Sequence, residues 1–401
     1  MGFGAWCNFH PFGWDRTRDD RPTLAKKYQN VLGGSPNNSY SRRGLNIQPH
    51  TSDCHEINQP QSGMRQQRIR RHIALGVAAG WATLMLAGAA SSGEILDIQQ
   101  LRDMAGTGRW AIYPHNPVLQ PGAKGAWDAG ALGSMTVLKV GSVCHMYYEA
   151  WGARENSSAD YLTLQIGHAT SPDGLHWTKD PANPVLPKGA AGEWDHDGTW
   201  DPFVLCEDGV FKMWYGGGES THCDWGYAVS TDGVHFTKKG RLSHLGNVED
   251  DHVVHDKAAG RYYMYYWDRK HEPAGLFRAQ SPTETDFDFA RAESVGIAGL
   301  VKPAMCKFTH VIQDGGQWRM FFGEFVRPGC KGCHTGLATS PDGVHWTAGN
   351  QNLLVGQDGE VLKLADDLWL MFYGPDGYFD QAGCDIRVAL FKGALADLGA
   401  R

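Results

Sequence analysis

The sequence has no excess of positive charge. It contains 37 Lys and Arg against 44 Asp and Glu, for a formal net charge of −7 over 401 residues. Nucleic acids and anionic lipid surfaces attract proteins with basic surfaces, so neither is an expected partner. No group of His, Cys, Asp and Glu has a spacing typical of a metal site. We therefore predict no metal, with a structural Ca²⁺ in an acidic channel as the alternative, since oxygen-rich sites suit hard cations.

Cysteines are few, and their number is odd once the first 63 residues are set aside. Two of the nine precede residue 64, so at least one of the remaining seven stays unpaired within a monomer. Cys330, Cys333 and His334 form the Cys-x-x-Cys-His pattern of c-type haem attachment. Cys333 also occupies the same repeat position as Cys223 and Cys384, so the scaffold explains it. We expect no haem and no other cofactor.

A long uncharged run extends from Ile73 to Gly93, after the basic segment 64–71. A positive segment, an apolar middle and small residues at the end predict a secretory signal peptide over residues 64–90. Residues 1–63 are polar and aperiodic. They are either a mis-assigned extension before a true start at Met64 or a disordered arm before a membrane-spanning helix. Both interpretations place residues 105–401 outside the cytoplasm, as a secreted or periplasmic domain or as a membrane-anchored one.

A methionine followed by two aromatic residues recurs at intervals of 67, 51, 56 and 51 residues. Each triplet lies in a short apolar run after a turn signal, which is typical of a β-hairpin. Repeats of this length built from antiparallel strands predict an all-β fold, a five-bladed β-propeller with four-stranded blades. The five triplets begin at Met146, Met213, Met264, Met320 and Met371.

A second repeat, Ser-x-Asp-Gly-x-His-aromatic, begins at Ser171, Ser230 and Ser340. Its Asp-Gly centre predicts a turn between strands, and its last aromatic residue is suited to packing between neighbouring blades. These residues are expected to build the scaffold rather than to carry chemistry.

The longest self-match predicts how the ring closes. Residues 110–148 align with residues 177–215 at a constant offset of 67, without a gap. The first copy therefore opens with a last strand that has no blade of its own, while blade five ends before its last strand. We predict that residues near 110–119 complete blade five, which leaves no free sheet edge.

Carboxylates recur at one position of the first strand of each blade. Each first strand ends in an apolar pair, and three residues earlier stand Ser134, Asp201, Asp250, Phe308 and Asp358. Since all five first strands line the central channel, the three aspartates should face a common space. Crowded carboxylates raise one another's pKa, so one can act as an acid while another stays ionised.

Further acids and tryptophans fall near these positions. Apolar sugar faces stack on indole rings, and fifteen tryptophans are many for this length. We predict that the substrate is bound by a set of acids and tryptophans. This set is Trp127, Trp194, Asp195, Asp197, Trp200, Asp358 and Glu360.

Asp201-Pro202-Phe203-Val204 resembles the Asp-Pro-x-Val first-strand motif of the five-bladed glycosidases, the arabinanase, levansucrase and invertase superfamily (glycoside hydrolase families 32, 43, 62, 68, 117 and 130). The turn and strand repeats are similar to that superfamily over residues 105–401. The resemblance implies catalytic acids from blades one, three and four. Asp250 matches blade three, whereas blade one has Ser134, and the blade-four segment 302–310 has no carboxylate.

The expected function is an exported glycoside hydrolase. Asp201 or Asp128 would activate water or attack the anomeric carbon, and Glu249, Asp250 or His310 would protonate the leaving oxygen. The separation of the carboxyl groups decides between inversion and retention. The alternative is a non-catalytic carbohydrate-binding propeller; a phosphorylase would need a basic phosphate pocket.

Overall fold

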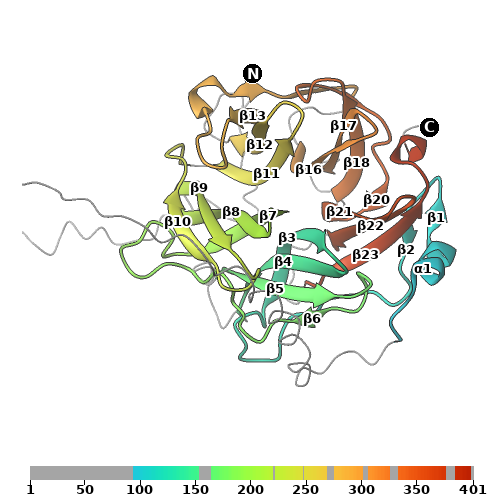
Figure 1. The fold of residues 1–401 in the computed structure, drawn as a ribbon, viewed down its shortest axis with the longest axis horizontal. Helices are drawn as coiled ribbons and strands as arrows, with labels where there is room; N and C mark the ends of the chain where they lie inside the picture. Colours follow the sequence, from blue (N-terminus) through green and yellow to red (C-terminus); the bar gives the residue numbers. More distant parts are fainter. Residues whose placement is uncertain are drawn as a thin grey trace, which may run out of the picture. The chain divides into compact units, whose positions relative to one another are not determined.

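The computed structural model describes residues 94–152, 164–219, 222–246, 248–268, 275–300, 306–325, 333–375 and 384–398. The predicted segments 1–63 and 64–90 lie outside these residues. Five antiparallel sheets are arranged in a ring, with the first strand of each sheet at its centre (Figure 1). The fold is the predicted all-β propeller.

Blades one and two each contain four strands in sequence order, from the centre outwards. Blade one consists of β3 (Ala131–Val140), β4 (Val143–Trp151), β5 (Gln165–Ser171) and β6 (Thr178–Lys179). Blade two consists of β7 (Thr199–Glu207), β8 (Val210–Glu219), β9 (His222–Ser230) and β10 (Thr237–Arg241).

Blades three and four repeat this order, and blade four has two extra short strands at its outer side. Blade three consists of β11 (Val248–Asp256), β12 (Arg261–Asp268), β13 (Gly275–Ser281) and β14 (Glu293–Ser294). Blade four consists of β16 (Cys306–Asp314), β17 (Gln317–Phe325), β18 (Cys333–Ser340) and β19 (His345–Ala348), with β15 (Gly296–Ala298) and β20 (Leu354–Val355).

Blade five combines both ends of the described chain. Its inner strands are β21 (Gln357–Ala365), β22 (Leu368–Gly374) and β23 (Arg387–Lys392). The short strands β1 (Gly106–Thr107) and β2 (Ala111–Ile112) pair with β23 from its outer side, β1 parallel and β2 antiparallel. The helix α1 (Ile98–Met104) precedes them, and two 3₁₀ turns lie at Phe289–Arg291 and Leu395–Leu398.

The methionine–aromatic triplets lie in the second strands and are buried. Met146, Met213, Met264, Met320 and Met371 all have no exposed surface. Because side chains alternate between the two faces of a strand, the methionine and the second aromatic residue of each triplet pack on one side of the blade and the first aromatic residue on the other. Tyr148, for example, shares a core cluster with Phe372 of blade five, whereas Tyr147 shares one with Phe211 of blade two.

The Ser-x-Asp-Gly repeats form the predicted turns. In the first copy, Asp173 Oδ1 accepts hydrogen bonds from the backbone N–H groups of Leu175 and His176, each at 2.9 Å. Gly174 has a φ of 80°, which suits glycine. The closing Trp177 packs edge-on against Phe372 of blade five, with ring centroids 5.7 Å apart. The prediction that this aromatic residue packs between blades is therefore confirmed.

Among the described residues, no helix is long and apolar enough to span a bilayer. The haem-like motif lies mostly outside the described part of the chain. Of its residues only the His334 side chain is described, and its Nδ1 lies 2.6 Å from Asn352 Oδ1.

Candidate active site

A pocket at the centre of the ring is lined by residues from all five first strands. It encloses about 400 Å³ of empty space, including its open mouth. The lining residues are Ser134, Met135, Thr136, Asp201, Pro202, Phe203, Asp250, Thr309, His310, Asp358, Gly359 and Glu360. The structure places five of the residues predicted from the sequence in this lining, namely Asp201, Asp250, His310, Asp358 and Glu360.

A β-bulge in every first strand shapes this pocket. The register with the second strand shifts between Trp200 and Phe203 in blade two, and the other four first strands shift at the equivalent place. Asp201, Asp250 and Asp358 lie in these bulges with φ angles of 42°, 55° and 53°. A bulge bends the strand and re-aims a side chain. Left-handed backbone at non-glycine residues is uncommon and strained, and such strain clusters at functional sites.

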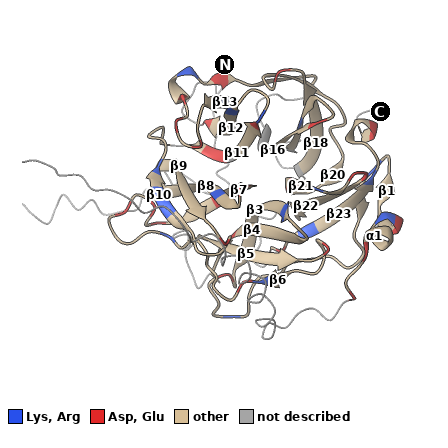
Figure 2. Cartoon of the chain, viewed as in Figure 1, with Lys and Arg blue, Asp and Glu red and all other residues tan. Residues whose placement is uncertain are grey.

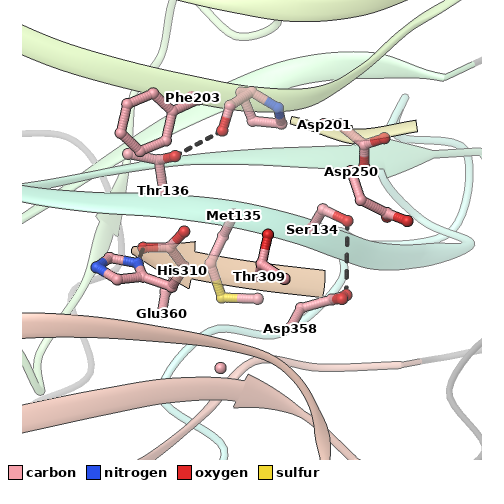
Figure 3. A pocket seen from close by; sticks show the side chains of 12 residues that line it. Ser134, Met135, Thr136, Asp201, Phe203, Asp250, Thr309, His310, Asp358 and Glu360 are labelled. Carbon is pink, nitrogen blue, oxygen red and sulfur yellow. Dashed lines mark hydrogen bonds and ion pairs between the residues drawn. The ribbon is translucent and has the colours of Figure 1, made fainter. Parts of the chain in front are cut away.

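The pocket has two levels (Figure 3). Ser134, Asp201, Asp250 and Asp358 lie at one end, where Ser134 Oγ is 3.5 Å from Asp358 Oδ2. Thr136, Phe203, His310 and Glu360 lie at the other end. We call this second group the lower level. Its residues lie two positions after the bulge residues, immediately before the apolar pair of each first strand.

The lower level forms a chain of contacts around the axis. Phe203 and His252 have ring centroids 4.1 Å apart, and His252 and His310 have ring centroids 4.6 Å apart. His310 Nδ1 contacts the carboxylate of Glu360. Sequence reasoning missed His252. The signal was present, because His252 immediately precedes the apolar pair of blade three, as His310 and Glu360 do in blades four and five.

His252, His310 and Glu360 could together hold a metal ion. One ligand atom from each lies within 4.8 Å of the others, and all three residues are buried. His252 Nε2 lies 2.8 Å from the backbone oxygen of Val311, an arrangement that orients many metal-binding histidines. Burial and the neighbouring His310 hold the pKa of His252 well below its usual value, so its ring is neutral. The sequence predicted no metal. The three ligands come from separate blades, so their spacing along the chain does not resemble a metal-binding motif.

Asp128 and Asp195 do not line the pocket. They follow equivalent tryptophans at the offset of 67, and each binds an outer-strand lysine instead. The Asp128 carboxylate contacts the Lys179 ammonium, and Asp195 Oδ2 lies 2.6 Å from Lys238 Nζ. Both aspartates are almost fully buried. Buried carboxylates need such partners, so this arrangement is a scaffold feature of blades one and two.

The predicted tryptophans also pack inside the blades rather than against the pocket. Trp127 stacks on Tyr148 with centroids 6.2 Å apart, and Trp194 lies 5.7 Å from Tyr215. Trp200 is 5% exposed.

Two predicted acids have other surroundings. Asp197 lies 3.2 Å from His196, outside the pocket lining. Glu249 is buried beside the blade-three bulge, where it pairs across the sheet with Trp267.

A buried acid that the sequence did not indicate lies behind the pocket. Glu149 on β4 is 2% exposed. Its Oε2 accepts a hydrogen bond of 3.0 Å from the backbone N–H of Asp201. Burial and the nearby charges of Asp201 and Asp358 hold the pKa of Glu149 well above its usual value. Glu149 follows a methionine–aromatic triplet, which the sequence predicts to be part of a hairpin strand.

Charge is distributed unevenly around this centre. Figure 2 shows acidic residues on β11 next to the middle of the ring. Of the described lining residues, none is Lys or Arg. The described part of the lining therefore carries acidic groups without a basic side chain.

Comparisons with solved structures support the fold. A glycosyl hydrolase from Bacteroides ovatus is 16% identical, with a TM-score of 0.55 over 70% of this chain and 92% of that one. A β-1,2-mannobiose phosphorylase from Listeria innocua is 14% identical, with a TM-score of 0.55 over 72% of this chain and 97% of that one. At these identities the likeness shows the five-bladed propeller fold.

Comparisons with curated sequences find uncharacterized relatives from Mycobacterium tuberculosis. An uncharacterized protein of Mycobacterium tuberculosis is 29% identical over 182 residues, 41% of this chain. The matched region spans 56% of that relative's length. No protein-family model matches the chain.

Proposed function

We propose that this protein is a glycoside hydrolase whose active site is the central pocket. The observation that carries the proposal is the convergence of Asp201, Asp250 and Asp358. Each lies in a bulge at the same position of a different blade, with left-handed backbone, and lines one pocket. Glycosidases that use two carboxyl groups need one acid and one base or nucleophile near the scissile bond, and this pocket offers both from rigid strands.

The chemistry can be assigned to these groups. Asp201 acts as the base or nucleophile, since it lies in the open pocket and its backbone is fixed by Glu149. Asp250 donates the proton to the leaving oxygen, with His310 as the other candidate acid. Thr309 Oγ1 is buried and has no hydrogen-bond partner among the described residues, so it is available to a sugar hydroxyl.

Hydrolysis fits the described lining better than phosphorolysis. A phosphate co-substrate needs cationic side chains to bind its charge, whereas the described lining contains three aspartates and no Lys or Arg. The predicted signal segment 64–90 motivates the further proposal that the enzyme is exported and meets its oligosaccharide substrate outside the cytoplasm.

The test is turnover by the purified full-length protein on a panel of aryl-glycosides and oligosaccharides, with and without phosphate. Asp201→Asn and Asp250→Asn should each lower kcat/KM by about 10²- to 10⁴-fold, the usual contribution of a general acid or base. Asp232→Asn, in an exposed turn of blade two, is the matched control and should keep full activity.

Three outcomes would change the assignment. Turnover that requires phosphate would make the protein a phosphorylase. Sugar binding by calorimetry without turnover on any substrate would make it a binding propeller. Turnover that survives in both aspartate variants would remove the pocket from the chemistry.

A further inference from the structure

Glu149 differs from the other acids around the pocket because it comes from the second strand of its blade. It follows the triplet 146–148 on β4 and is buried behind the bulge of β3. Its carboxyl group accepts the backbone N–H of Asp201 in blade two, and the backbone of Ser134 in blade one also hydrogen-bonds to it. Glu149 thus connects two neighbouring blades directly at the pocket.

Blade one fills this position differently from its repeat copy. In blade two, Trp200 of the first strand lies opposite Gly216 of the second. A Cβ on Gly216 would lie 2.4 Å from Trp200 Nε1, so there is room for only one large side chain. At the offset of 67, the equivalents in blade one are Gly133 and Glu149. The large side chain now comes from the second strand.

The reversed pair is tightly packed in blade one as well. A Cβ on Gly133 would lie 2.1 Å from Glu149 Oε1. Gly133 therefore leaves the space that the Glu149 carboxyl occupies. Blades three, four and five place Glu249, Lys307 and Gln357 on the first strand at this position, opposite Trp267, Gly323 and Gly374.

We propose that Glu149 is a positioning residue of the active site, the blade-one carboxyl that fixes the left-handed backbone of Asp201 and lies directly beside this pocket aspartate. This inference rests on the proposed function for its catalytic meaning. Its structural content stands on the buried contact between Glu149 and Asp201. Blade one has only a hydroxyl, Ser134, at the bulge itself, and Glu149 brings a carboxyl group to the same place from the neighbouring strand.

The surroundings of Glu149 decide its protonation. Among the described residues, the charges that act on it are those of Asp201 from β7 and Asp358 from β21. The adjacent strand β5 contributes the uncharged Gln165 and Ile166. A buried carboxyl between two aspartates favours its neutral form. A protonated Glu149 can still accept the Asp201 N–H, and it limits the repulsion among the acids that line the pocket.

The first measurement needs no substrate. Glu149→Gln keeps an oxygen acceptor but cannot ionise, and its Tm is compared with that of the wild type from pH 4 to 8. A group whose folded pKa is raised favours the folded state fully below its unfolded pKa, and this advantage is lost as the pH rises through the folded pKa. The Tm of the variant should therefore increase relative to that of the wild type as the pH rises, by roughly 2 to 5 °C for each unit by which the pKa of Glu149 is raised.

Glu207→Gln is the matched control, because the pKa of Glu207 is shifted in the opposite direction from that of Glu149. Lys212, His255 and Tyr262 surround Glu207 and hold its pKa at about 2. Its removal should cost stability above the unfolded pKa of a glutamate, and the difference should shrink as the pH falls toward 2. A Tm difference for Glu149→Gln that is constant from pH 4 to 8 would overturn the placement of the Glu149 carboxyl beside the pocket acids.

The second measurement tests positioning through hydrogen exchange at the Asp201 amide. Glu149→Ala should speed this exchange by about tenfold or more, the equivalent of one lost hydrogen bond, while Glu149→Gln should retain protection. Equal protection in Glu149→Ala and the wild type would overturn the positioning role. Neither readout depends on turnover. A protein without glycosidase activity would therefore refute the proposed function, while these two results would still test the structural role of Glu149.

Activity adds the catalytic readout where turnover is found. An ionised Glu149 raises the pKa of the neighbouring catalytic acid, so Glu149→Gln should move the alkaline limb of the pH–rate profile to lower pH. Glu149→Ala should lower kcat more than it raises KM. A pH–rate profile for Glu149→Gln that matches the wild type would contradict a link between Glu149 and the catalytic acids.

Discussion

Blades one and two are copies of one module, and they differ mainly where they face the channel. Both contain a tryptophan that packs on a second-strand tyrosine and an aspartate that binds an outer-strand lysine. At the bulge, however, blade one has Ser134 and blade two has Asp201. Behind the bulge, Glu149 replaces Trp200 as the large side chain. The scaffold positions match, whereas the chemistry of the pocket differs between the copies.

This difference shows that the repeat between blades one and two marks scaffold positions rather than the chemistry of the pocket. A residue repeated in both copies, such as Asp128 and Asp195, serves the part of the blade that both must build. Ser134 and Asp201, which break the repeat between these two blades, face the one space that the five blades share. Functional candidates are therefore better sought where the copies disagree at channel positions.

The largest expected effect separates the bulge residues of the two blades. Asp201→Asn should reduce kcat/KM by about 10²- to 10⁴-fold, while Ser134→Ala should reduce it by less than about tenfold, since it removes one weak hydrogen bond to Asp358. Steady-state kinetics of both variants provides the measurement. Equal losses would mean that blades one and two contribute alike to the chemistry.

The next effect concerns the space behind each bulge. Gly216→Ala should destabilise the fold by about 1 to 3 kcal/mol, because the new methyl group would meet the rigid Trp200 ring. Gly133→Ala should cost less, because the carboxyl end of Glu149 can shift. Urea unfolding measures both values. A larger loss for Gly133→Ala would show that Glu149 is held more firmly than Trp200.

The ion pairs that both blades share should have smaller, matched effects. Asp128→Asn and Asp195→Asn each leave a lysine whose side chain is 27% exposed and can reach water. We expect each to cost about 1 kcal/mol of stability, typical of a partly exposed charged pair, and to leave kcat/KM within about twofold. A large loss of turnover in Asp128→Asn would restore it as a catalytic candidate.

The last effect appears only at low pH and is confined to blade two and its contact with blade three. Glu207 contacts His255 and lies 2.8 Å from Lys212 Nζ, whereas the blade-one equivalent is Val140. The pKa of Glu207 is about 2, so its contribution to stability is present above the unfolded pKa and is lost as the pH falls through about 2. Thermal melts of Glu207→Gln and the wild type should converge in that window. A difference that persists at low pH would indicate a packing effect instead.

Much of the scaffold was readable from the sequence because each module repeats a local pattern. The Asp-Gly turns and the methionine–aromatic strands depend on neighbours within a few residues, and the number of repeats predicted the number of blades. The first-strand position of Asp201, Asp250 and Asp358 was also predictable, since the apolar pairs set its register.

The acids outside the pocket were harder to place. Asp128 has the same residue type as Asp201 and lies only a few residues before a bulge, but its side chain turns to Lys179 on the outer strand. The sequence gives no sign of this contact, which joins residues 51 positions apart. Trp200 likewise resembles a sugar-stacking residue, and only the opposite Gly216 explains its burial.

The sequence alone determined a five-bladed all-β ring and placed three aspartates at one position of its first strands, because turns, strand periodicity and repeat spacing are local properties. The tertiary structure decided which side chains share the central pocket. His252 meets His310 and Glu360, and Glu149 meets Asp201, through contacts between different blades. Ring closure brings these residues together, and the bulges and packing of adjacent blades set the direction of each side chain.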